Sequence, residues 1–277
     1  RCQEYLLEPV VLNMSDTLFR MAGERQDERM QAVAIATQLD YYYFQGTNED
    51  SVIHYTNKVK EFAKATHQPK YYYFAWANRL ITYYLKTSRT NIALYEVQNM
   101  LKEAQEEDDK TGLSRCYNIM SQIYTIKRFD SMAFEWRLKE IELTEKYKIE
   151  NYNISQTYAQ IANYYINQKK QKEALAAVEK AIATANSSTQ QISAKLEFVN
   201  YYSKFGDFQA AEKLLKECQA AFEQDKRLES IKKRLYNIEC LYYQQTKQYQ
   251  KALEAAKMQE KEERRLSESI LSSSHYR

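Results

Sequence analysis

A pair of amphipathic helices recurs along this chain at an interval of about forty residues. The clearest copy runs from Ser155 to Ser188, where two helical runs flank a short polar break at 167–171. In the first run, apolar residues fall at the i, i+3, i+4 and i+7 spacing of one helix face, at Tyr158, Ile161, Ala162 and Tyr165. Small residues on both runs allow two helix backbones to approach closely, so this stretch predicts an antiparallel helix pair.

Four other segments carry the same arrangement, which makes the pair a repeat. The aligned residues stand 40, 41, 37 and 41 positions apart, at Ile81, Ser121, Ala162, Val199 and Cys240. Recurrence at a nearly constant interval is the signature of a solenoid. The 277 residues include only 4 Gly and 2 Pro, and a sheet protein with many tight turns would need more. We therefore expect an all-α solenoid of about six antiparallel helix pairs.

The pattern also suggests how the chain is divided. Residues 1–24 hold one helical candidate, about Val11 to Ala22, which we interpret as a lead-in or capping helix. Residues 25–265 form the repeat domain, and residues 266–277 form the end of a capping or stalk helix. The glycines stand where we expect helices to end or turn, at Gly23, Gly46, Gly112 and Gly206. Because the sequence begins with Arg, we expect it to be a processed or truncated product.

Composition argues against several functional classes. The formal net charge is +3, from 40 basic and 37 acidic residues that are interspersed, so no nucleic-acid partner is expected. The four cysteines lack CxxC spacing, and the three histidines are far apart in sequence. No Gly-rich phosphate loop or hydrolase motif is present. We expect no catalytic residues, no metal site, no cofactor and, since no apolar run is long enough, no membrane insertion by this fragment.

The clearest copy resembles the tetratricopeptide repeat (TPR). The matching residues are Tyr158, Ile161, Ala162, Tyr165, Ala174, Val178 and Ala181. The turn Gly206-Asp207-Phe208, followed by Ala211, is also similar to the TPR turn. The resemblance implies a right-handed superhelix whose first helices line a concave surface. These repeats are longer than the family's length of about 34 residues, and Arg137 and Glu140 stand where the third repeat should have apolar or small residues.

The TPR resemblance also implies which residues line the groove, namely those three before and one after each aligned residue. One row is then Asn78, Asn118, Ala159, Leu196 and Asn237, and the next is Thr82, Gln122, Asn163, Asn200 and Leu241. Four cationic residues face the same way at the edges: Lys86, Arg115, Lys204 and Arg234. A carboxamide offers both a donor and an acceptor, which suits the backbone of an extended peptide. The alternative is that these rows simply face water.

The candidate binding residues follow from these rows, and they imply a peptide or protein ligand. They are Asn78, Thr82, Arg115, Asn118, Gln122, Asn163, Asn200, Lys204, Arg234 and Asn237. We therefore interpret the chain as a non-enzymatic binding module with no cofactor.

Its long, Tyr-rich repeats and charged last helix resemble the extracytoplasmic sensor regions of TPR-containing histidine kinases and related regulators in Bacteroidetes-type bacteria. That resemblance implies a periplasmic sensor in a two-component system, with a signal passed through the helix near 266–271 and a homodimer formed through it. The alternatives are a cytoplasmic peptide-pheromone receptor of the TPR regulator type and a passive assembly scaffold.

Overall fold

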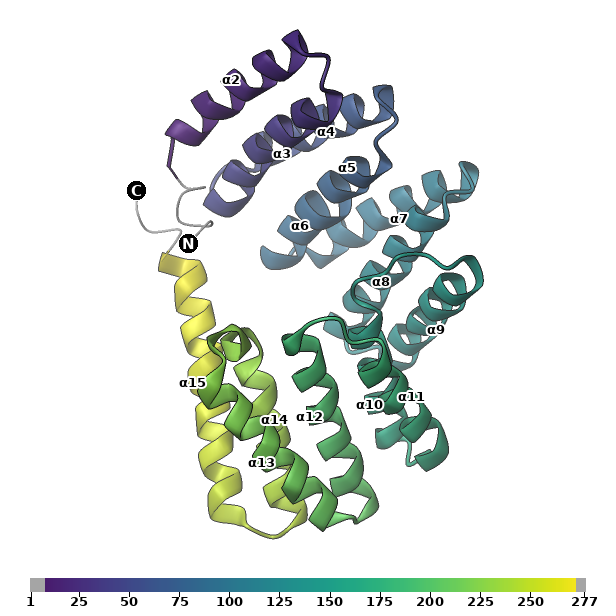
Figure 1. Ribbon diagram of the computed structural model, residues 1–277, viewed down its shortest axis with the longest axis vertical. Helices are drawn as coiled ribbons and strands as arrows, with labels where there is room; N and C mark the ends of the chain where they lie inside the picture. Colours follow the sequence, from purple (N-terminus) through teal and green to yellow (C-terminus); the bar gives the residue numbers. More distant parts are fainter. Residues whose placement is uncertain (1–7, 273–277) are drawn as a thin grey trace. The chain divides into compact units, whose positions relative to one another are not determined.

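The computed structural model describes residues 8–272, and every regular element within them is a helix (Figure 1). The first half contains α2 (Val10–Glu24), α3 (Glu28–Gln45), α4 (Glu49–Ala65), α5 (Pro69–Tyr73), the π-helix η1 (Phe74–Ile81), α6 (Thr82–Lys86), α7 (Thr90–Glu106) and α8 (Lys110–Ile126). It is followed by α9 (Asp130–Tyr147), α10 (Ile154–Asn167), α11 (Gln171–Ala183), α12 (Ser188–Phe205), α13 (Phe208–Gln224), the 3₁₀-helix η2 (Lys226–Ile231), α14 (Lys232–Gln245) and α15 (Tyr249–Ser272).

The described helices form adjacent pairs, so the predicted all-α class and its helix pairs are confirmed. The pairs are α3 with α4, the continuous α5–η1–α6 rod with α7, α8 with α9, α10 with α11, α12 with α13, and α14 with α15. The lead-in helix predicted from Val11 to Ala22 is α2. The predicted end segment 266–277 lies partly outside the described residues, and the boundaries proposed at 24/25 and 265/266 stay predictions.

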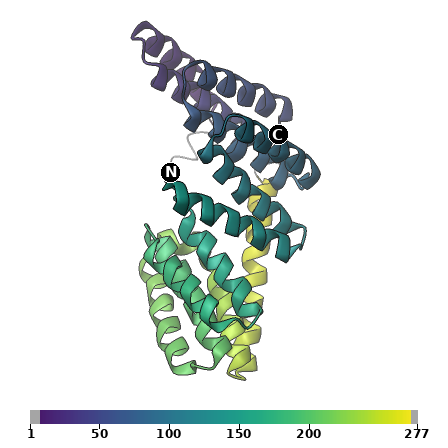
Figure 2. The ribbon, with the colours of Figure 1, turned by 90° about the vertical axis from the view of Figure 1, so that its right-hand side faces the viewer.

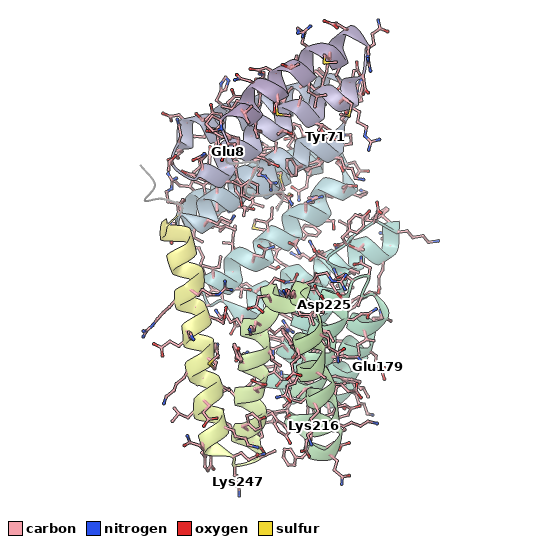
Figure 3. The ribbon with its side chains drawn as sticks, turned by 60° about the vertical axis from the view of Figure 1, so that its left-hand side comes forward. Glu8, Tyr71, Glu179, Lys216, Asp225 and Lys247 are labelled. Atoms are coloured by element: carbon pink, nitrogen blue, oxygen red, sulfur yellow. The ribbon has the colours of Figure 1, made fainter. Side chains whose placement is uncertain are left out.

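The chain divides into two compact units, and the division falls within α9. Unit 1 runs to Trp136, and unit 2 runs from Arg137 to Ile270. In unit 2 each first helix packs against the next one, α10 on α12 and α12 on α14. The green and yellow helices of this unit run alongside one another in Figure 2. Charged side chains such as Glu179 of α11 and Lys216 of α13 are exposed on its second helices (Figure 3).

Aromatic side chains fill the core of unit 1. The rings of Tyr43, Tyr73 and Trp76 are each at most 7% exposed. The guanidinium of Arg79 lies 4.3 Å from the ring centroid of Phe74 and 4.8 Å from that of Tyr43, and it forms an ion pair with Asp40 at 2.5 Å. These cation–π contacts bury an arginine among rings. Tyr43 and Tyr73 therefore pack between helices, which accounts for part of the Tyr-rich composition.

A π-helical segment interrupts the first helix of the second pair. It spans Phe74–Ile81 within a rod that otherwise runs from Pro69 to Lys86. The hydroxyl of Thr82 donates to the carbonyl of Ala77 at 3.0 Å, five residues earlier. This bond satisfies a carbonyl within the widened turns. The sequence predicted one regular helix here, because the residues that favour α and π turns are the same.

Gly112 does not end a helix, so that prediction was wrong. It lies in the first turn of α8, whose N-cap is Asp109, and its backbone N–H donates to the Asp109 carboxylate at 3.0 Å. The other carboxylate oxygen accepts from the Tyr73 hydroxyl at 2.8 Å. A Cβ on Gly112 would meet that hydroxyl at 2.4 Å. Glycine is therefore needed for close approach, and the Asp109 cap starts α8 at Lys110.

Helix ends in this chain seldom use glycine. Gly46 and Gly206 do adopt positive φ at the ends of α3 and α12, as predicted, whereas Gly23 lies inside α2. Within the described residues, eight residues other than glycine also have positive φ: Gln26, His67, Ser88, Asp108, Arg128, Lys148, Lys169 and Lys247. Left-handed backbone costs an L-residue energy that glycine avoids. The helix ends that lack glycine therefore carry some backbone strain.

The core of unit 2 is built from small and aliphatic residues. Ala162, Ala174 and Val178 are fully buried, as the repeat pattern predicted. The two charged residues that departed from the pattern are also buried, and both have partners. Arg137 Nε donates to the Gln160 side chain at 2.8 Å. Glu140 accepts from the side chains of Asn151 at 2.8 Å and of Thr157 at 3.3 Å.

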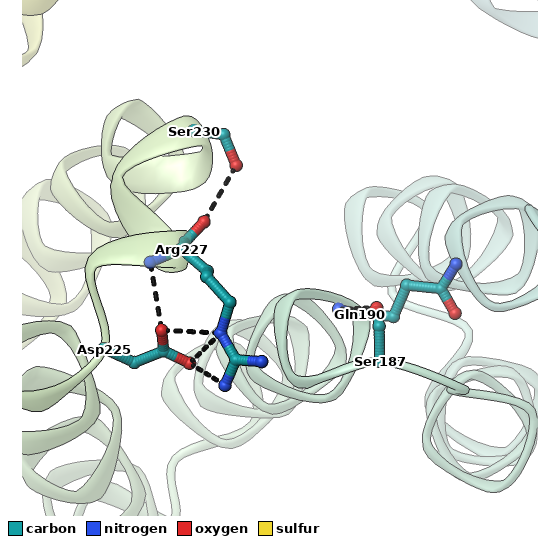
Figure 4. A network of polar contacts seen from close by, with 5 residues as sticks. All are labelled: Ser187, Gln190, Asp225, Arg227 and Ser230. Atoms are coloured by element: carbon teal, nitrogen blue, oxygen red, sulfur yellow. Dashed lines mark hydrogen bonds and ion pairs between the residues drawn. The ribbon is translucent and has the colours of Figure 1, made fainter. Parts of the chain in front are cut away.

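A polar network closes the connection between α13 and η2 (Figure 4). The Asp225 carboxylate accepts from the backbone N–H of Arg227 at 3.0 Å and from its guanidinium at 2.8 Å. These bonds lower the pKa of Asp225 to about 2. On the neighbouring α12, the hydroxyl of Ser187 accepts from the backbone N–H of Gln190 at 3.2 Å and caps the helix. The loops at this edge of unit 2 are thus held by local hydrogen bonds.

Candidate partner-binding site

One pocket in unit 2 is built from the first helices of three successive pairs, α10, α12 and α14. Its volume is about 290 Å³. It is lined by Asn163, Ile166 and Asn167 of α10, by Asn200, Ser203 and Lys204 of α12, and by Asn237, Leu241 and Gln245 of α14. We call it the unit-2 pocket. The structure therefore brings together Asn163, Asn200, Lys204 and Asn237 of the predicted set, although their role in binding stays a prediction.

The packing of α12 against both α10 and α14 brings three asparagines to this pocket. Asn163 and Asn200 each follow the aligned residue of their repeat by one position, so they are equivalent neighbours. Asn237 stands three positions before its aligned residue Cys240, one helical turn from Leu241, which is the equivalent residue of α14. Asn200 is buried, Asn163 is half-buried and Asn237 is exposed. The three carboxamides thus differ in how much of each a ligand can reach.

A buried glutamate joins three helices beneath this wall. Glu197 of α12 is 2% exposed. Its carboxylate accepts from the side-chain nitrogen of Asn163 at 3.2 Å, from that of Asn200 at 2.8 Å and from the guanidinium of Arg234 at 2.7 Å. Burying a carboxylate costs energy unless hydrogen bonds and a counter-charge compensate. Here α10, α12 and α14 each supply one donor, so the cluster links the same three helices as the pocket.

Sequence reasoning missed Glu197, although a signal was present. It stands two residues before the aligned residue Val199, and Ile119 and Ile238 hold that position in other repeats. Arg79 and Gln160 hold it in the remaining two, so the position is apolar in two repeats and polar in three. A carboxylate at a position that is buried in other repeats has to be paired. Leu196, which we placed in the groove, is fully buried in the core of unit 2.

Arg234 lies at a second, smaller pocket of unit 2. This pocket has a volume of about 150 Å³ and is lined by Ser155, Gln156, Ala159, Thr189, Gln190, Ser193, Ala194, Ile231 and Arg234. One terminal nitrogen of Arg234 donates a hydrogen bond to Glu197. Within the described residues, the Nε of Arg234 is buried without a hydrogen-bond acceptor. Neither unit-2 pocket has a carboxylate among its described lining residues. Both therefore offer cations and neutral polar groups.

In unit 1 the predicted residues bind one another. Arg115 donates to the side-chain oxygen of Asn78 at 2.7 Å, and Gln122 donates to that of Asn118 at 2.7 Å. Burial lowers the pKa of the Arg115 guanidinium. Thr82 uses its hydroxyl within its own helix. These five residues are placed on neighbouring first helices, as predicted, and the unit-1 pocket at the helix ends does not contain them.

A larger pocket in unit 1 lies instead at the ends of helices. Its volume is about 390 Å³, and its lining includes Tyr72, Glu103 and Glu107. Its charges are already paired. Lys64 contacts the carboxylates of Glu103 at 3.3 Å and of Glu107 at 3.1 Å, and Tyr72 donates to Glu103. This pocket is consequently a closed network of internal partners.

The described residues contain neither a metal-type cluster nor a membrane-spanning helix. No group of three or more histidine, cysteine or acidic side chains among them is arranged to hold a metal ion. None of the described helices combines the length and apolar character that a membrane span requires. Burial raises the pKa of Cys116 and Cys218 to about 12, which keeps these two thiols protonated and unreactive at neutral pH.

Comparison with known proteins supports the fold. No protein-family model matches the sequence, and no curated protein matches it significantly. The crystal structure of BtubC (BKLC) from P. vanneervenii is similar with a TM-score of 0.57 and 16% identity, over 80% of this chain and 93% of that one. The crystal structure of a Rap protein complexed with competence and sporulation factor is similar with a TM-score of 0.53 and 17% identity, over 94% of this chain and 76% of that one. The chain has a TPR-like helical repeat fold.

Proposed function

We propose that this chain is a non-enzymatic binding module that holds an extended peptide, or an extended segment of a protein, against the first helices of unit 2. One observation carries the proposal. The carboxamides of Asn163, Asn200 and Asn237 come from three successive helices at equal sequence intervals and line one open pocket. Side chains that repeat along a solenoid wall suit a ligand that is itself extended and repetitive, as a peptide backbone is.

The rest of the lining describes the expected ligand. Leu241, which is half-buried, offers apolar surface for one side chain of the ligand, and Lys204 lies exposed in the same lining. A cation without a neighbouring carboxylate in the lining favours an anionic group. We therefore expect a peptide with an acidic residue or a free carboxylate placed near Lys204. Carboxamides would bind the adjoining backbone.

The structural comparison supports a ligand-holding role. A Rap protein of the same general fold was crystallised with competence and sporulation factor. At 17% identity the likeness concerns the fold, so the proposal depends on the pocket itself.

For the cellular setting we keep the sequence-based proposal of a periplasmic sensor region. Its signal would pass through the last helix, which would also form a homodimer. The alternatives are a cytoplasmic peptide-pheromone regulator and a passive scaffold. The full-length gene separates these settings: a signal peptide upstream with a membrane span downstream favours the sensor, and an upstream helix-turn-helix favours the regulator.

The binding proposal is tested by panning a random-peptide display library against the folded chain. Recovered peptides are then titrated calorimetrically against the wild type, Asn163→Ala and Asn200→Ala. We expect each variant to weaken binding by about tenfold, the effect of one lost hydrogen bond to a desolvated group. Asn78→Ala is the matched control, since it removes an asparagine of the predicted groove that lies in unit 1. Equal affinities for all four proteins would refute the proposal.

A further inference from the structure

We infer that Glu197 is a positioning residue for the ligand, because it determines which way the carboxamides of Asn163 and Asn200 face in the unit-2 pocket. The inference rests on the proposed function, since it concerns the same pocket. It adds the hydrogen-bonding pattern that the pocket presents and the chemical group that this pattern selects.

An asparagine amide can turn so that either its oxygen or its nitrogen meets a given neighbour. Glu197 removes that freedom for two of the three pocket asparagines. It forms an ion pair with Arg234 at 2.7 Å, and a carboxylate in such a pair can only accept hydrogen bonds. Asn163 and Asn200 must therefore both turn their nitrogen toward it, as the distances of 3.2 and 2.8 Å show.

The oxygens of the two amides consequently point away from Glu197 and toward the pocket. At Asn163 a second contact shows this direction. Its Oδ1 accepts from the side-chain nitrogen of Asn167 at 3.1 Å, and Asn167 also lines the pocket. A carbonyl oxygen has two lone pairs, so this atom can still accept from a ligand. Within the described part of the chain, no side chain donates a hydrogen bond to the Asn200 oxygen, so this atom is available to a ligand.

Two acceptors at a fixed orientation select a ligand that presents N–H groups. The backbone of an extended peptide does so at every residue except proline. The pocket is thus specific for peptide segments with free backbone N–H groups facing α10 and α12. Proline or N-methylated residues at those positions will be rejected, because they leave the Asn200 oxygen unpaired and cost the Asn163 oxygen its second hydrogen bond.

The test compares Glu197→Gln with the wild type, using the strongest peptide recovered from the display library. Glutamine has nearly the same shape but only one acceptor atom, whereas Arg234 uses one carboxylate oxygen and the two asparagines share the other. We expect the glutamine oxygen to keep the charge-assisted hydrogen bond from Arg234, which is the stronger one. Its NH₂ group then faces the nitrogens of Asn163 and Asn200, so both asparagines must turn. The matched control is Glu239→Gln. Glu239 lies on α14, is half-buried and accepts from Gln219 at 2.7 Å, but does not line the pocket.

Two readouts separate positioning from simple stability. The first is the NMR signals of the Asn163 and Asn200 side-chain amides without ligand, which we expect to shift in Glu197→Gln and not in Glu239→Gln. The second is a scan of the peptide with one backbone nitrogen methylated at a time. In the wild type at least one methyl group should weaken binding by about tenfold or more. In Glu197→Gln the unmethylated peptide should bind about tenfold more weakly than it binds the wild type. The same N-methyl group should then cause a much smaller further loss of affinity than it causes in the wild type.

Each outcome is decisive. Unchanged amide signals in Glu197→Gln would overturn the inference whether or not a peptide binds. Shifted signals with an unchanged affinity and methyl scan would overturn the role of Glu197 while the proposed function stands. A wild-type chain that captures no peptide would overturn the proposed function, and this role in binding with it.

Discussion

Arg115 in unit 1 and Arg234 in unit 2 hold the same place in their repeats but have different partners. Each stands six residues before its aligned residue, Ser121 or Cys240, and each binds a side chain 37 residues earlier. For Arg115 that partner is Asn78, neutral and exposed. For Arg234 it is Glu197, charged and 2% exposed.

This difference shows how one repeat scaffold supports two kinds of surface. In unit 1 the polar row is satisfied by its own members, since Arg115 bonds Asn78 and Gln122 bonds Asn118. In unit 2 a carboxylate beneath the wall takes up the donors, and the oxygens of the asparagines stay available to a ligand. We propose that Glu197, whose position is held by Arg79, Ile119, Gln160 and Ile238 in the other repeats, makes the wall of unit 2 the one that binds a ligand.

The largest effect should come from breaking the buried partner. Glu197→Ala removes the anion of a guanidinium that is only 28% exposed and leaves two amides without their acceptor. We expect the free energy of unfolding to fall by about 2–4 kcal/mol. Asn78→Ala, the counterpart in unit 1, should change it by less than about 0.5 kcal/mol. Urea unfolding followed by circular dichroism measures both, and equal losses would remove the distinction between the units.

The next effect should come from the close packing of unit 1. In Gly112→Ala the new methyl group would lie 2.4 Å from the Tyr73 hydroxyl, which also holds the Asp109 cap. We expect a loss of about 1–3 kcal/mol from overpacking, measured by the same unfolding experiment. Thr111→Ala, at an exposed neighbouring position, is the control and should be nearly neutral. A stable Gly112→Ala variant would show that Tyr73 can move aside.

A smaller effect concerns Glu239, the second half-buried glutamate of unit 2. Burial raises its pKa, and the hydrogen bond from Gln219 lowers it by less. The folded state therefore binds this proton more tightly than the unfolded chain, whose glutamates have a pKa of about 4.3. Its contribution to stability is present at low pH and is lost as pH rises through the folded pKa. Glu239→Gln should be more stable than the wild type at pH 7 and lose this dependence. Thermal melts of both proteins between about pH 4 and pH 7 test whether the stability difference grows as pH rises, as expected; a difference that shrinks would contradict the raised pKa.

The smallest effect should come from the left-handed helix ends, where the two units are alike. Lys169→Gly in unit 2 and Arg128→Gly in unit 1 both place glycine at positive φ, where each residue is now exposed. We expect each to gain up to about 1 kcal/mol, because relief of backbone strain exceeds the extra entropy of the unfolded chain. Differential scanning calorimetry would record the gain. A loss in either variant would mean that the replaced side chain makes a stabilising contact.

Periodicity and residue size were enough to predict the helix pairs, because they determine which face of each helix is buried. The repeat register likewise predicted Asn163 and Asn200 in one row and Asn237 in the adjacent row of the groove, and the structure brings all three to one pocket. Features that depend on contacts between helices were missed. Glu197 is understood only with its three donors in place, and Gly112 only with Tyr73 above it. The π-helix Phe74–Ile81 has no distinguishing composition, since packing selects it and local preference does not.

The central claim is that the first helices of unit 2 form the binding wall, while those of unit 1 do not. Hydrogen–deuterium exchange of the whole chain, with and without a library-derived peptide, tests it most directly. The account predicts slower exchange on α10, α12 and α14 when the peptide is bound, and unchanged exchange on η1, α6 and α8. Protection confined to the helices of unit 1, or spread equally over both units, would contradict it.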